Sequence, residues 1–205
     1  MHHLSLVFEV LLQNTLYLKH SKCQFGVSHI EYLGHVISVD GVSMDIEKVK
    51  CMMDWPYPTT VKKVRGFLGL TGYYRRFVRH YGLIAKPLID LLKRNAFEWT
   101  VDTQTAWDAL KQAMCIAPVL ALPNFNTLFV VEVNACSNGI GAVLSQCGKP
   151  LAFLSKALSL KHQSLSVYDK EMLAIPLVVK KWNAYLVGQC FQIKTDHHNL
   201  KFLLD

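Results

Sequence analysis

The sequence lacks long apolar runs, paired cysteines and a secretory leader. No segment of its 205 residues reaches the ~18 uninterrupted apolar positions that a membrane-spanning helix needs. The start, MHHLSLVFEVLLQN, has no basic region and no small-residue cleavage site, so it predicts an amphipathic helix rather than a signal peptide. The six cysteines form no C-x-x-C pair and none stands at zinc-finger spacing from paired histidines. These absences predict an intracellular protein that neither enters a membrane nor binds a structural zinc.

Acidic residues are also scarce, most of all in one segment. The chain has 22 Lys and Arg against 15 Asp and Glu, a net charge of +7. Residues 62–82, KKVRGFLGLTGYYRRFVRHYG, contain no acid and interleave basic with aromatic side chains. Two interpretations stay open. The segment is either the solvated basic face of a packing helix, or a nucleic-acid surface on which Lys and Arg hold phosphates while Tyr and Phe pack on sugars or bases.

The composition is that of a folded protein, with 51% hydrophobic and 18% charged residues. Residues 1–46 predict a helix over about 2–14, then strand-like runs in TLYLKHSKCQFG and in HIEYLGHVIS, which ends at an Asp40-Gly41 turn. Residues 47–122 are predicted to be mainly helical. After the break at WPYP, either Thr59 or Thr60 can cap the next helix.

Residues 123–205 have a third pattern. LFVVEV, IGAVLSQ and KPLAFLSKAL predict three strands in an antiparallel meander. A long amphipathic helix follows, and its expected apolar stripe is Leu165, Tyr168, Met172, Ile175, Val179, Trp182 and Leu186. Gly188 ends the helix, CFQIKTD is a further strand, and HHNLKFLLD begins another helix. The order βββαβ(α) predicts an α/β unit, so the whole chain is of the α+β / α/β class.

Three polar residues lie at the ends of these elements. Asn134 closes the first strand of the meander, Glu171 borders the apolar stripe of the helix, and Asp196 closes the strand QIKTD. If the first and fourth strands are neighbours, the three positions converge, and two Mg²⁺ ions need several such oxygen ligands. Taken singly, each residue also has a plain explanation, as a turn residue, a surface acid and a helix N-cap respectively.

Long strings of residues decide between these interpretations. From end to end the chain resembles the Pol polyprotein of gypsy-type LTR retrotransposons, from the end of the reverse transcriptase palm through the thumb into the RNase H domain. The strings that carry the resemblance occur in the family order: KCQFGVSHIEYLGHVIS, DGV, WPYPTTVKKVRGFLGLTGYYRRFVRHYGLIAKPL, FEWT, APVLALPNF, GIGAVLSQ, YDKEMLAI and TDHHNLKFL.

The resemblance implies a role for each region. Residues 1–46 correspond to the end of the palm, 47–122 to the helical thumb and connection, and 123–205 to an RNase H-like domain that the chain end cuts short. EYLGH corresponds to the primer grip and 62–82 to the thumb surface that follows the template–primer duplex. The implied nucleic-acid-binding residues are Tyr32, Leu33, Gly34, His35, Lys62, Lys63, Arg65, Tyr73, Tyr74, Arg75, Arg76 and Arg79. The implied metal ligands are Glu171 and Asp196, and Asn134 stands where the family has its first catalytic acid.

The sequence departs from the family pattern at Asn134 and at Pro176. An amide offers one neutral oxygen where the family's aspartate bridges two metals, and Glu132, about 6.7 Å along the strand, is a poor substitute. Pro176 removes a hydrogen bond inside the long helix and is expected to kink or weaken it. The paired aspartates of the polymerase are expected upstream of Met1.

The resemblance thus implies a fragment of an RNA-directed DNA polymerase with an Mg²⁺-dependent RNase H domain. Its expected partners are an RNA–DNA hybrid or primer–template duplex and, in a full polyprotein, a protease and an integrase. As a lone chain it is expected to have neither activity. A non-catalytic nucleic-acid-binding module and a decayed transposon remnant remain the alternatives.

Overall fold

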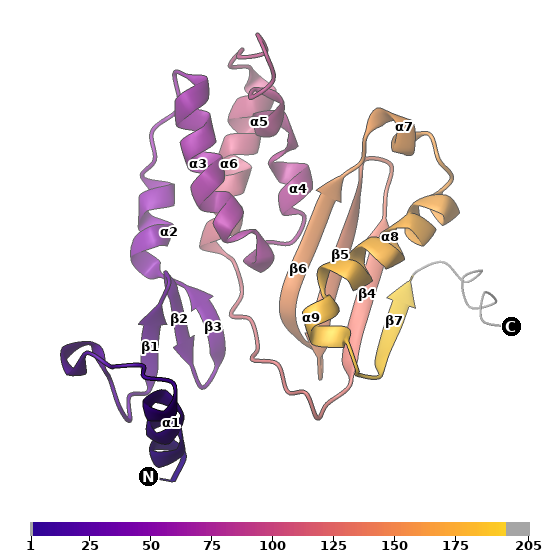
Figure 1. The fold of residues 1–205 in the computed structure, drawn as a ribbon. Helices are drawn as coiled ribbons and strands as arrows, with labels where there is room; N and C mark the ends of the chain where they lie inside the picture. The colour runs from indigo at the N-terminus through magenta and orange to yellow at the C-terminus, as the bar shows by residue number, and fades with distance from the viewer. Residues whose placement is uncertain (1, 196–205) are drawn as a thin grey trace, which may run out of the picture.

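A computed structural model describes residues 2–195 of the chain. Its elements fall into an N-terminal helix with a small sheet, a group of helices and a larger sheet (Figure 1). The elements of the first part are α1 (His2–Gln13), the 3₁₀ turn η1 (His20–Lys22), β1 (His29–Tyr32), β2 (His35–Ser38) and β3 (Gly41–Met44). The helical part consists of α2 (Ile46–Met53), α3 (Val61–Tyr73), the 3₁₀ turn η2 (Arg75–Phe77), α4 (Tyr81–Ile84), α5 (Lys86–Asp90) and α6 (Val101–Cys115).

The second sheet has the strand order β6-β5-β4-β7. Its elements are β4 (Phe129–Ala135), β5 (Gly139–Gln146), β6 (Lys149–Ala157), α7 (Leu160–Gln163), α8 (Val167–Lys181), α9 (Asn183–Leu186) and β7 (Phe191–Thr195). β4, β5 and β6 form the predicted antiparallel meander, and β7 lies parallel to β4. The first and fourth strands are therefore neighbours, which is the condition that the convergence of the three polar positions required.

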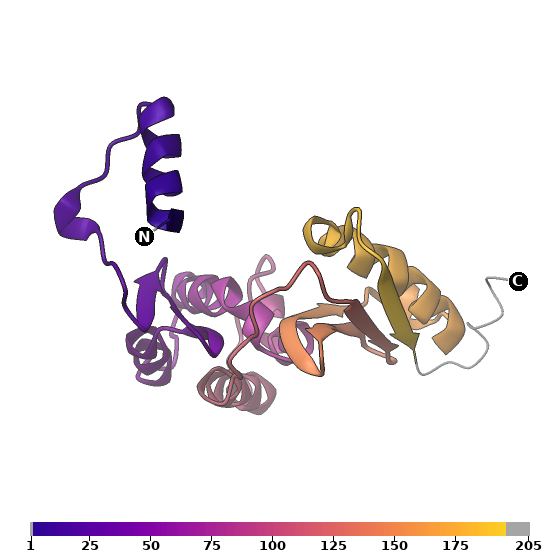
Figure 2. The ribbon, with the colours of Figure 1, turned by 90° about the horizontal axis from the view of Figure 1, so that it is seen from below.

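The N-terminal helix α1 lies away from the helical part and the larger sheet (Figure 2), and it contacts the segment that follows it through Phe8 and Phe25. Its side chains are exposed or half-buried, although the prediction of a helix over about 2–14 is confirmed. The strand predicted in TLYLKHSKCQFG is wrong, because this segment contains only the turn η1 between extended, exposed stretches. The alternation in this segment has no sheet edge to pair with, and alternation alone does not form a strand.

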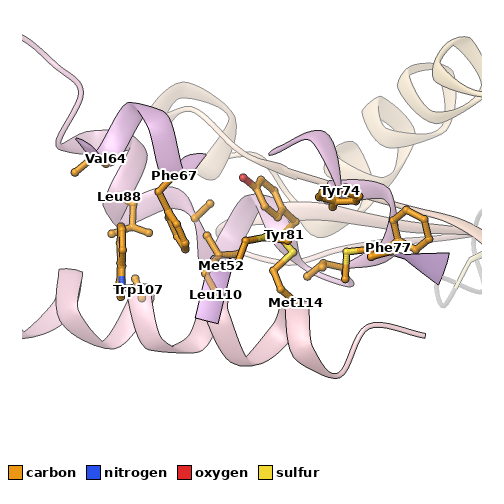
Figure 3. Packing of buried hydrophobic residues seen from close by; sticks show 14 of the residues in the cluster. Met52, Val64, Phe67, Tyr74, Phe77, Tyr81, Leu88, Trp107, Leu110 and Met114 are labelled. Carbon is orange, nitrogen blue, oxygen red and sulfur yellow. The ribbon is translucent and has the colours of Figure 1, made fainter. Parts of the chain in front are cut away.

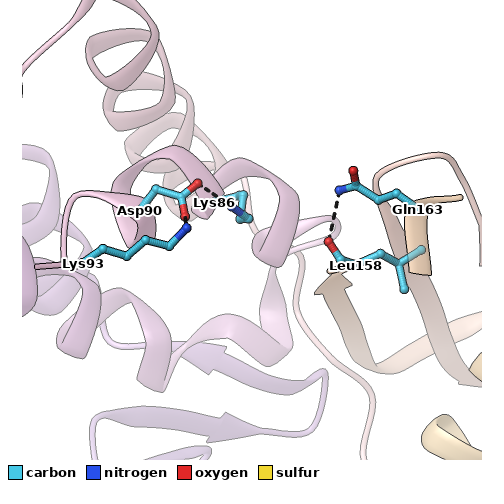
Figure 4. Close-up of polar contacts among 5 residues, drawn as sticks. All are labelled: Lys86, Asp90, Lys93, Leu158 and Gln163. Carbon is cyan, nitrogen blue, oxygen red and sulfur yellow. Dashed lines mark hydrogen bonds and ion pairs between the residues drawn. The ribbon is translucent and has the colours of Figure 1, made fainter. Parts of the chain in front are cut away.

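The helical part encloses its own hydrophobic core. Phe67 of α3 and Trp107 of α6 are fully buried and stack with ring centroids 3.9 Å apart (Figure 3). Local capping starts each long helix. Thr60, rather than Thr59, accepts from the backbone of Lys63, and Thr100 forms a capping box at α6. On the surface, Lys86 and Lys93 both pair with Asp90 (Figure 4).

A close backbone contact ties the small sheet to the segment that leaves α6. Val42 of β3 and Leu120 exchange backbone hydrogen bonds of 2.7 and 2.8 Å. Gly41 permits this approach, because its φ is +134° and a Cβ there would lie 2.1 Å from the carbonyl oxygen of Leu120. Residue 41 is therefore restricted to glycine for two independent reasons.

The second core lies between α8 and the sheet. Phe129, Val131 and Val133 of β4 are buried beneath α8, which starts after the N-cap Ser166. The buried residues of α8, of α9 and of the position between them are Lys170, Glu171, Ala174, Val178, Trp182 and Leu186. The predicted stripe is thus correct at Trp182 and Leu186. Ile175 and Val179 are half-buried against the same core, but the fully buried positions of α8 lie one residue before Met172, Ile175 and Val179.

Three further features fix the ends of these elements. α8 continues past Pro176, which is exposed on the side away from the sheet, and ends at Lys181. Gly188, with a φ of +71°, follows the short helix α9, so the prediction that it ends the long helix is wrong, because that helix already ends at Lys181. The side-chain amide of Gln163 donates to the carbonyl of Leu158 at 3.1 Å and so ties α7 to the end of β6 (Figure 4).

The helical part and the sheet contact each other along the edge strand β6. α4 lies against this strand, and a Cβ at Gly82 would stand 2.7 Å from the carbonyl oxygen of Ser155. Phe153 of β6 also packs against the helical core. Among the described helices, none combines the length and the apolar character needed to cross a membrane.

Candidate functional site

Glu171 lies inside the helix–sheet interface, whereas the sequence placed it at the border of the apolar stripe. α8 crosses β4, so that Glu171 faces the sheet with Ala174 and Val178, and only 2% of its surface is exposed. The hydroxyl of Thr195, the last residue of β7, donates a hydrogen bond to Oε2 of Glu171. A buried carboxylate is therefore held at the carboxyl end of β7.

Asn134 lies at the same end of the sheet. Its neighbour Val133 pairs with Thr195, and Asn134 itself pairs with Gly141 of β5. Along β4 the residues alternate between buried and exposed, and Val133 is buried on the α8 side whereas Asn134 is on the exposed side with Glu132. Asn134 and Glu171 therefore lie at the same end of the sheet, but the alternation along β4 places their side chains on opposite faces of it. Asp196, the third predicted ligand, lies outside the described residues.

A hollow of about 240 Å³ surrounds Asn134. Arg79 and His80, from the segment between η2 and α4, form one wall of it, and Glu132 and Lys194 form another. The ring of His80 lies against Gly141, since a Cβ there would be 3.7 Å from its Nδ1. Arg79 and Lys194 bring two positive charges to the hollow, and Glu132 brings one negative charge.

The described residues do not fit a two-metal centre. Asn134 supplies a neutral oxygen, Glu132 stands beside its strand partner Lys194, and the carboxylate of Glu171 accepts from Thr195. No group of three His, Cys, Asp or Glu with metal-binding geometry occurs within residues 2–195. A Mg²⁺ pair needs several carboxylates around it, and the described residues at this end of the sheet do not supply them.

The EYLGH hairpin is fastened to the end of α3 by two tyrosines. The hydroxyl of Tyr73 donates to the carbonyl of Leu33 at 2.8 Å, and that of Tyr74 donates to the carbonyl of Gly34 at 2.8 Å. Leu33 and Gly34 form the turn with φ values of +50° and +75°. Tyr32 and Leu33 are exposed at the tip, with 60% and 68% of their surfaces accessible. The hairpin thus presents its tip on a fixed support.

His35 is enclosed by aromatic rings. Its ring stacks on Tyr73 at 5.3 Å and meets Tyr74 edge-on at 5.4 Å and Phe77 at 5.5 Å between centroids. Burial, followed by the positive charge of Arg76, lowers the pKa of His35 below its usual value. Its Nδ1 is buried without a hydrogen-bond partner among the described residues. His35 therefore supports the hairpin as a neutral ring.

The predicted nucleic-acid-binding residues divide into two groups. Lys62, Lys63, Arg65, Arg75 and Arg79 are exposed, as a contact surface requires. Tyr74 is only 1% exposed, so its predicted contact with nucleic acid is wrong and its role is to anchor the hairpin. Arg76 is half-buried and donates to the carbonyl of Leu151 at 3.4 Å.

Several residues near these sites were not found by sequence reasoning. His80 and Lys194 join the hollow at Asn134, and Lys156, Lys180 and Lys181 face Arg75 and Arg76 across a second depression. The only sequence pattern that could have indicated the second depression is the adjacent pair Lys180 and Lys181 at the end of α8. Their approach to Arg75 depends on how the sheet meets the helical part, which no local pattern encodes.

The fold and the corner formed by β4, β7 and α8 are those of an RNase H-like unit that follows a helical segment. Residues 99–193 match the family profile described as the RNase H-like domain found in reverse transcriptase. The chain is also similar in structure to the foamy viral protease–reverse transcriptase in complex with RNA/DNA hybrid. That similarity has a TM-score of 0.85 and 22% identity, and covers 99% of this chain and 29% of the other.

Sequence relatives define the family more closely. The chain is 39% identical over 205 residues to the retrovirus-related Pol polyprotein from transposon 297 of Drosophila melanogaster. This alignment covers 98% of this chain and 19% of that protein. It is 48% identical over 135 residues to an uncharacterized mitochondrial protein of Arabidopsis thaliana, covering 65% of this chain and 85% of that protein. The chain belongs to the family of retrovirus-related Pol polyproteins from transposons, which includes those of gypsy and opus. It spans about a fifth of the length of the transposon 297 polyprotein.

Proposed function

We propose that this chain is the part of a Pol reverse transcriptase that holds RNA–DNA hybrid or primer–template duplex without cleaving it. The carrying observation is the row of exposed cations Lys62, Lys63 and Arg65 on α3, whose far end supports the EYLGH hairpin. A duplex binds along such a row through its phosphates, largely independent of sequence. The foamy viral relative, which binds RNA/DNA hybrid, supports this proposal.

Binding by this surface has a direct test. Lys62→Gln, Lys63→Gln and Arg65→Gln together are expected to lower hybrid affinity and to reduce the slope of log affinity against log salt by roughly 3, because three phosphate contacts are lost. Fluorescence anisotropy with a labelled hybrid over a salt series measures both quantities. A triple variant at Lys19, Lys22 and Lys48, which are exposed and outside α3, is the charge-matched control. Equal losses of hybrid affinity in the two triple variants would contradict the proposal that α3 is the binding surface.

The expectation that the chain does not cleave hybrid rests on the residue at position 134. The RNase H chemistry of the family relies on carboxylates around Mg²⁺, and Asn134 cannot supply the charge. We expect no magnesium-dependent hybrid cleavage by the chain alone. Turnover by the purified chain, abolished by Glu171→Gln, would overturn this part of the proposal.

Cleavage and polymerisation by a longer Pol protein form the second candidate. Glu171 favours it, because its carboxylate is in place at the carboxyl end of β7. In a longer Pol protein, Asn134→Asp is expected to raise magnesium-dependent hybrid cleavage. If cleavage stays unchanged, the loss of the acid at 134 is not what limits the site.

A further inference from the structure

A groove of about 910 Å³ lies between η2 and the carboxyl half of α8. The middle of the edge strand β6 forms its floor, α8 and α9 form one wall, and η2 forms the other. Its volume is at the upper end of the range of about 300–1,000 Å³ that is typical of small-ligand pockets. The groove is separate from the hollow at Asn134, and the two depressions share only Leu154 among their lining residues.

The groove is lined by cations from three different elements. Arg75 and Arg76 come from η2, Lys156 from β6, and Lys180 and Lys181 from the last turn of α8. None of its described lining residues is an Asp or a Glu. Positive charges gathered in one depression without counter-charges repel one another and attract a polyanion. The ligand that this lining favours carries several negative charges.

Two buried polar atoms at the groove lack a hydrogen-bond partner among the described residues. They are Nε of Arg76 and Oγ of Ser155. Arg76 is fixed in place, because another of its guanidinium nitrogens donates to the carbonyl of Leu151 at 3.4 Å. Buried donors are normally satisfied, and a phosphate oxygen accepts from both guanidinium and hydroxyl groups.

Aromatic side chains complete the lining. Tyr73 is half-exposed, and Tyr185 of α9 is half-buried. Proteins that bind single-stranded nucleic acid combine a positively charged groove with aromatic rings on which bases stack. The walls of η2 and α8 leave a depression of pocket size, which fits a few nucleotides of one strand and not a duplex.

We propose that this groove binds a short segment of single-stranded nucleic acid through its phosphates. This inference rests on the proposed function only in that the chain binds nucleic acid. The hybrid or duplex is assigned to α3, and the single strand is assigned to the groove. An unpaired strand continuing from a hybrid held at the hairpin would reach the groove past Tyr73, which contacts the hairpin and lines the groove.

The test compares two double variants of equal charge. Lys180→Gln with Lys181→Gln removes two groove cations on the α8 wall, and Lys48→Gln with Lys161→Gln removes two exposed cations outside the groove. Anisotropy with a labelled single strand of about 10 nucleotides, and with a labelled hybrid, is measured over a salt series. The groove variant is expected to lose about tenfold in single-strand affinity and roughly 1.4 in salt slope, while the control and the hybrid affinity stay near those of the unaltered chain.

Each other outcome counts against the groove. Equal loss in both variants would mean that single strands bind by general charge alone. If the unaltered chain binds the hybrid but not the single strand, this inference is overturned and the proposed function stays intact. If the unaltered chain binds neither ligand, both are overturned. If a free mononucleotide competes as well as the oligonucleotide at equal phosphate concentration, the ligand of the groove is a small phosphate compound and not a strand, and this inference is overturned.

Discussion

The hydroxyl of Tyr74 donates a hydrogen bond of 2.8 Å to the carbonyl oxygen of Gly34, and so the end of α3 holds the turn of the β1–β2 hairpin. The same turn cannot carry a larger residue, because a Cβ at Gly34 would lie 2.6 Å from that hydroxyl oxygen and the φ of Gly34 is +75°. The position of the hairpin tip is therefore set by the end of α3 and not by the small sheet alone.

Loss of this hydroxyl is expected to loosen the hairpin. Tyr74→Phe removes the donor and leaves the carbonyl of Gly34 without its partner, so we expect a loss of about 1 kcal/mol in the free energy of unfolding. Urea denaturation measures the stability, and amide hydrogen exchange in β1 and β2 locates the effect. Tyr57→Phe is the matched control, because the Tyr57 hydroxyl donates to Asp108 at an exposed site. Equal effects from both variants would contradict the prediction.

The stability of the hairpin support is expected to depend on pH through His35. Burial and then Arg76 lower its folded-state pKa below the usual value of 6.5, so near that pH the unfolded chain binds more protons than the folded chain. The stabilisation from neutral His35 is complete above about pH 6.5 and is lost as the pH falls through this value toward the lower folded pKa. The urea midpoint, measured as a function of pH, reports the loss.

His35→Phe keeps an aromatic ring between Tyr73 and Phe77 and removes the titrating group. In this variant the fall in stability below about pH 6.5 is expected to be smaller than in the unaltered chain. His162→Gln, at an exposed position of α7, is the control and is expected to retain the full pH dependence. A pH profile that His35→Phe leaves unchanged would assign the dependence to other groups.

The contact between the two cores is expected to fail when Gly82 gains a side chain. In Gly82→Ala the added carbon would meet backbone atoms of Ser155 and Lys156 at 2.7 to 3.2 Å, and overpacking of this kind costs about 1–3 kcal/mol. We expect lower stability, and separate unfolding of the helical core and the sheet core when tryptophan fluorescence and circular dichroism are compared. Gly69→Ala on α3 is the control, since nothing lies within 4 Å of its Cβ position and alanine favours the helix by roughly 0.5–1 kcal/mol.

Metal dependence is expected to appear when the acid at 134 is restored. The unaltered chain is expected to melt at the same temperature in Mg²⁺ and in a chelator, because Asn134 contributes no charge. Asn134→Asp should raise the melting temperature in Mg²⁺ relative to the chelator, since binding to the folded state stabilises it. The effect is expected to vanish when Glu171→Gln is added. A gain that survives this second change would place the metal elsewhere.

Sequence patterns predicted the elements better than their contacts. The strand patterns located β4, β5 and β6, whereas the β4–β7 pair was only a condition of the expected site and was not predicted. The helix period was found, but its buried face was placed one residue off, because Glu171 and Ala174 lie inward where the hydropathy favoured Met172 and Ile175. A carboxylate satisfied by Thr195 can be buried, and hydropathy alone does not register that partner.

The candidate sites show the same division. The strand pattern placed Asn134 at the end of β4, but the burial of Glu171 was not expected. Tyr74 was assigned to the ligand surface because a basic and aromatic string does not reveal which rings are inside. The convergence of Arg75 with Lys180 and Lys181 depends on the tertiary contact between α4 and β6. Residues so far apart in the chain give no periodic signal.

The bridge between Val42 and Leu120 has a consequence for the order of events during synthesis. The small sheet is complete at Met44, yet its outer strand finds this partner only after α6 and the segment beyond it have been made. Contacts between residues so distant in sequence close slowly, because the intervening chain must first be ordered. During synthesis the helical core is therefore expected to complete its packing only once Leu120 has emerged from the ribosome. The bridge between Val42 and Leu120 would then close before the larger sheet, which begins at β4, starts to form.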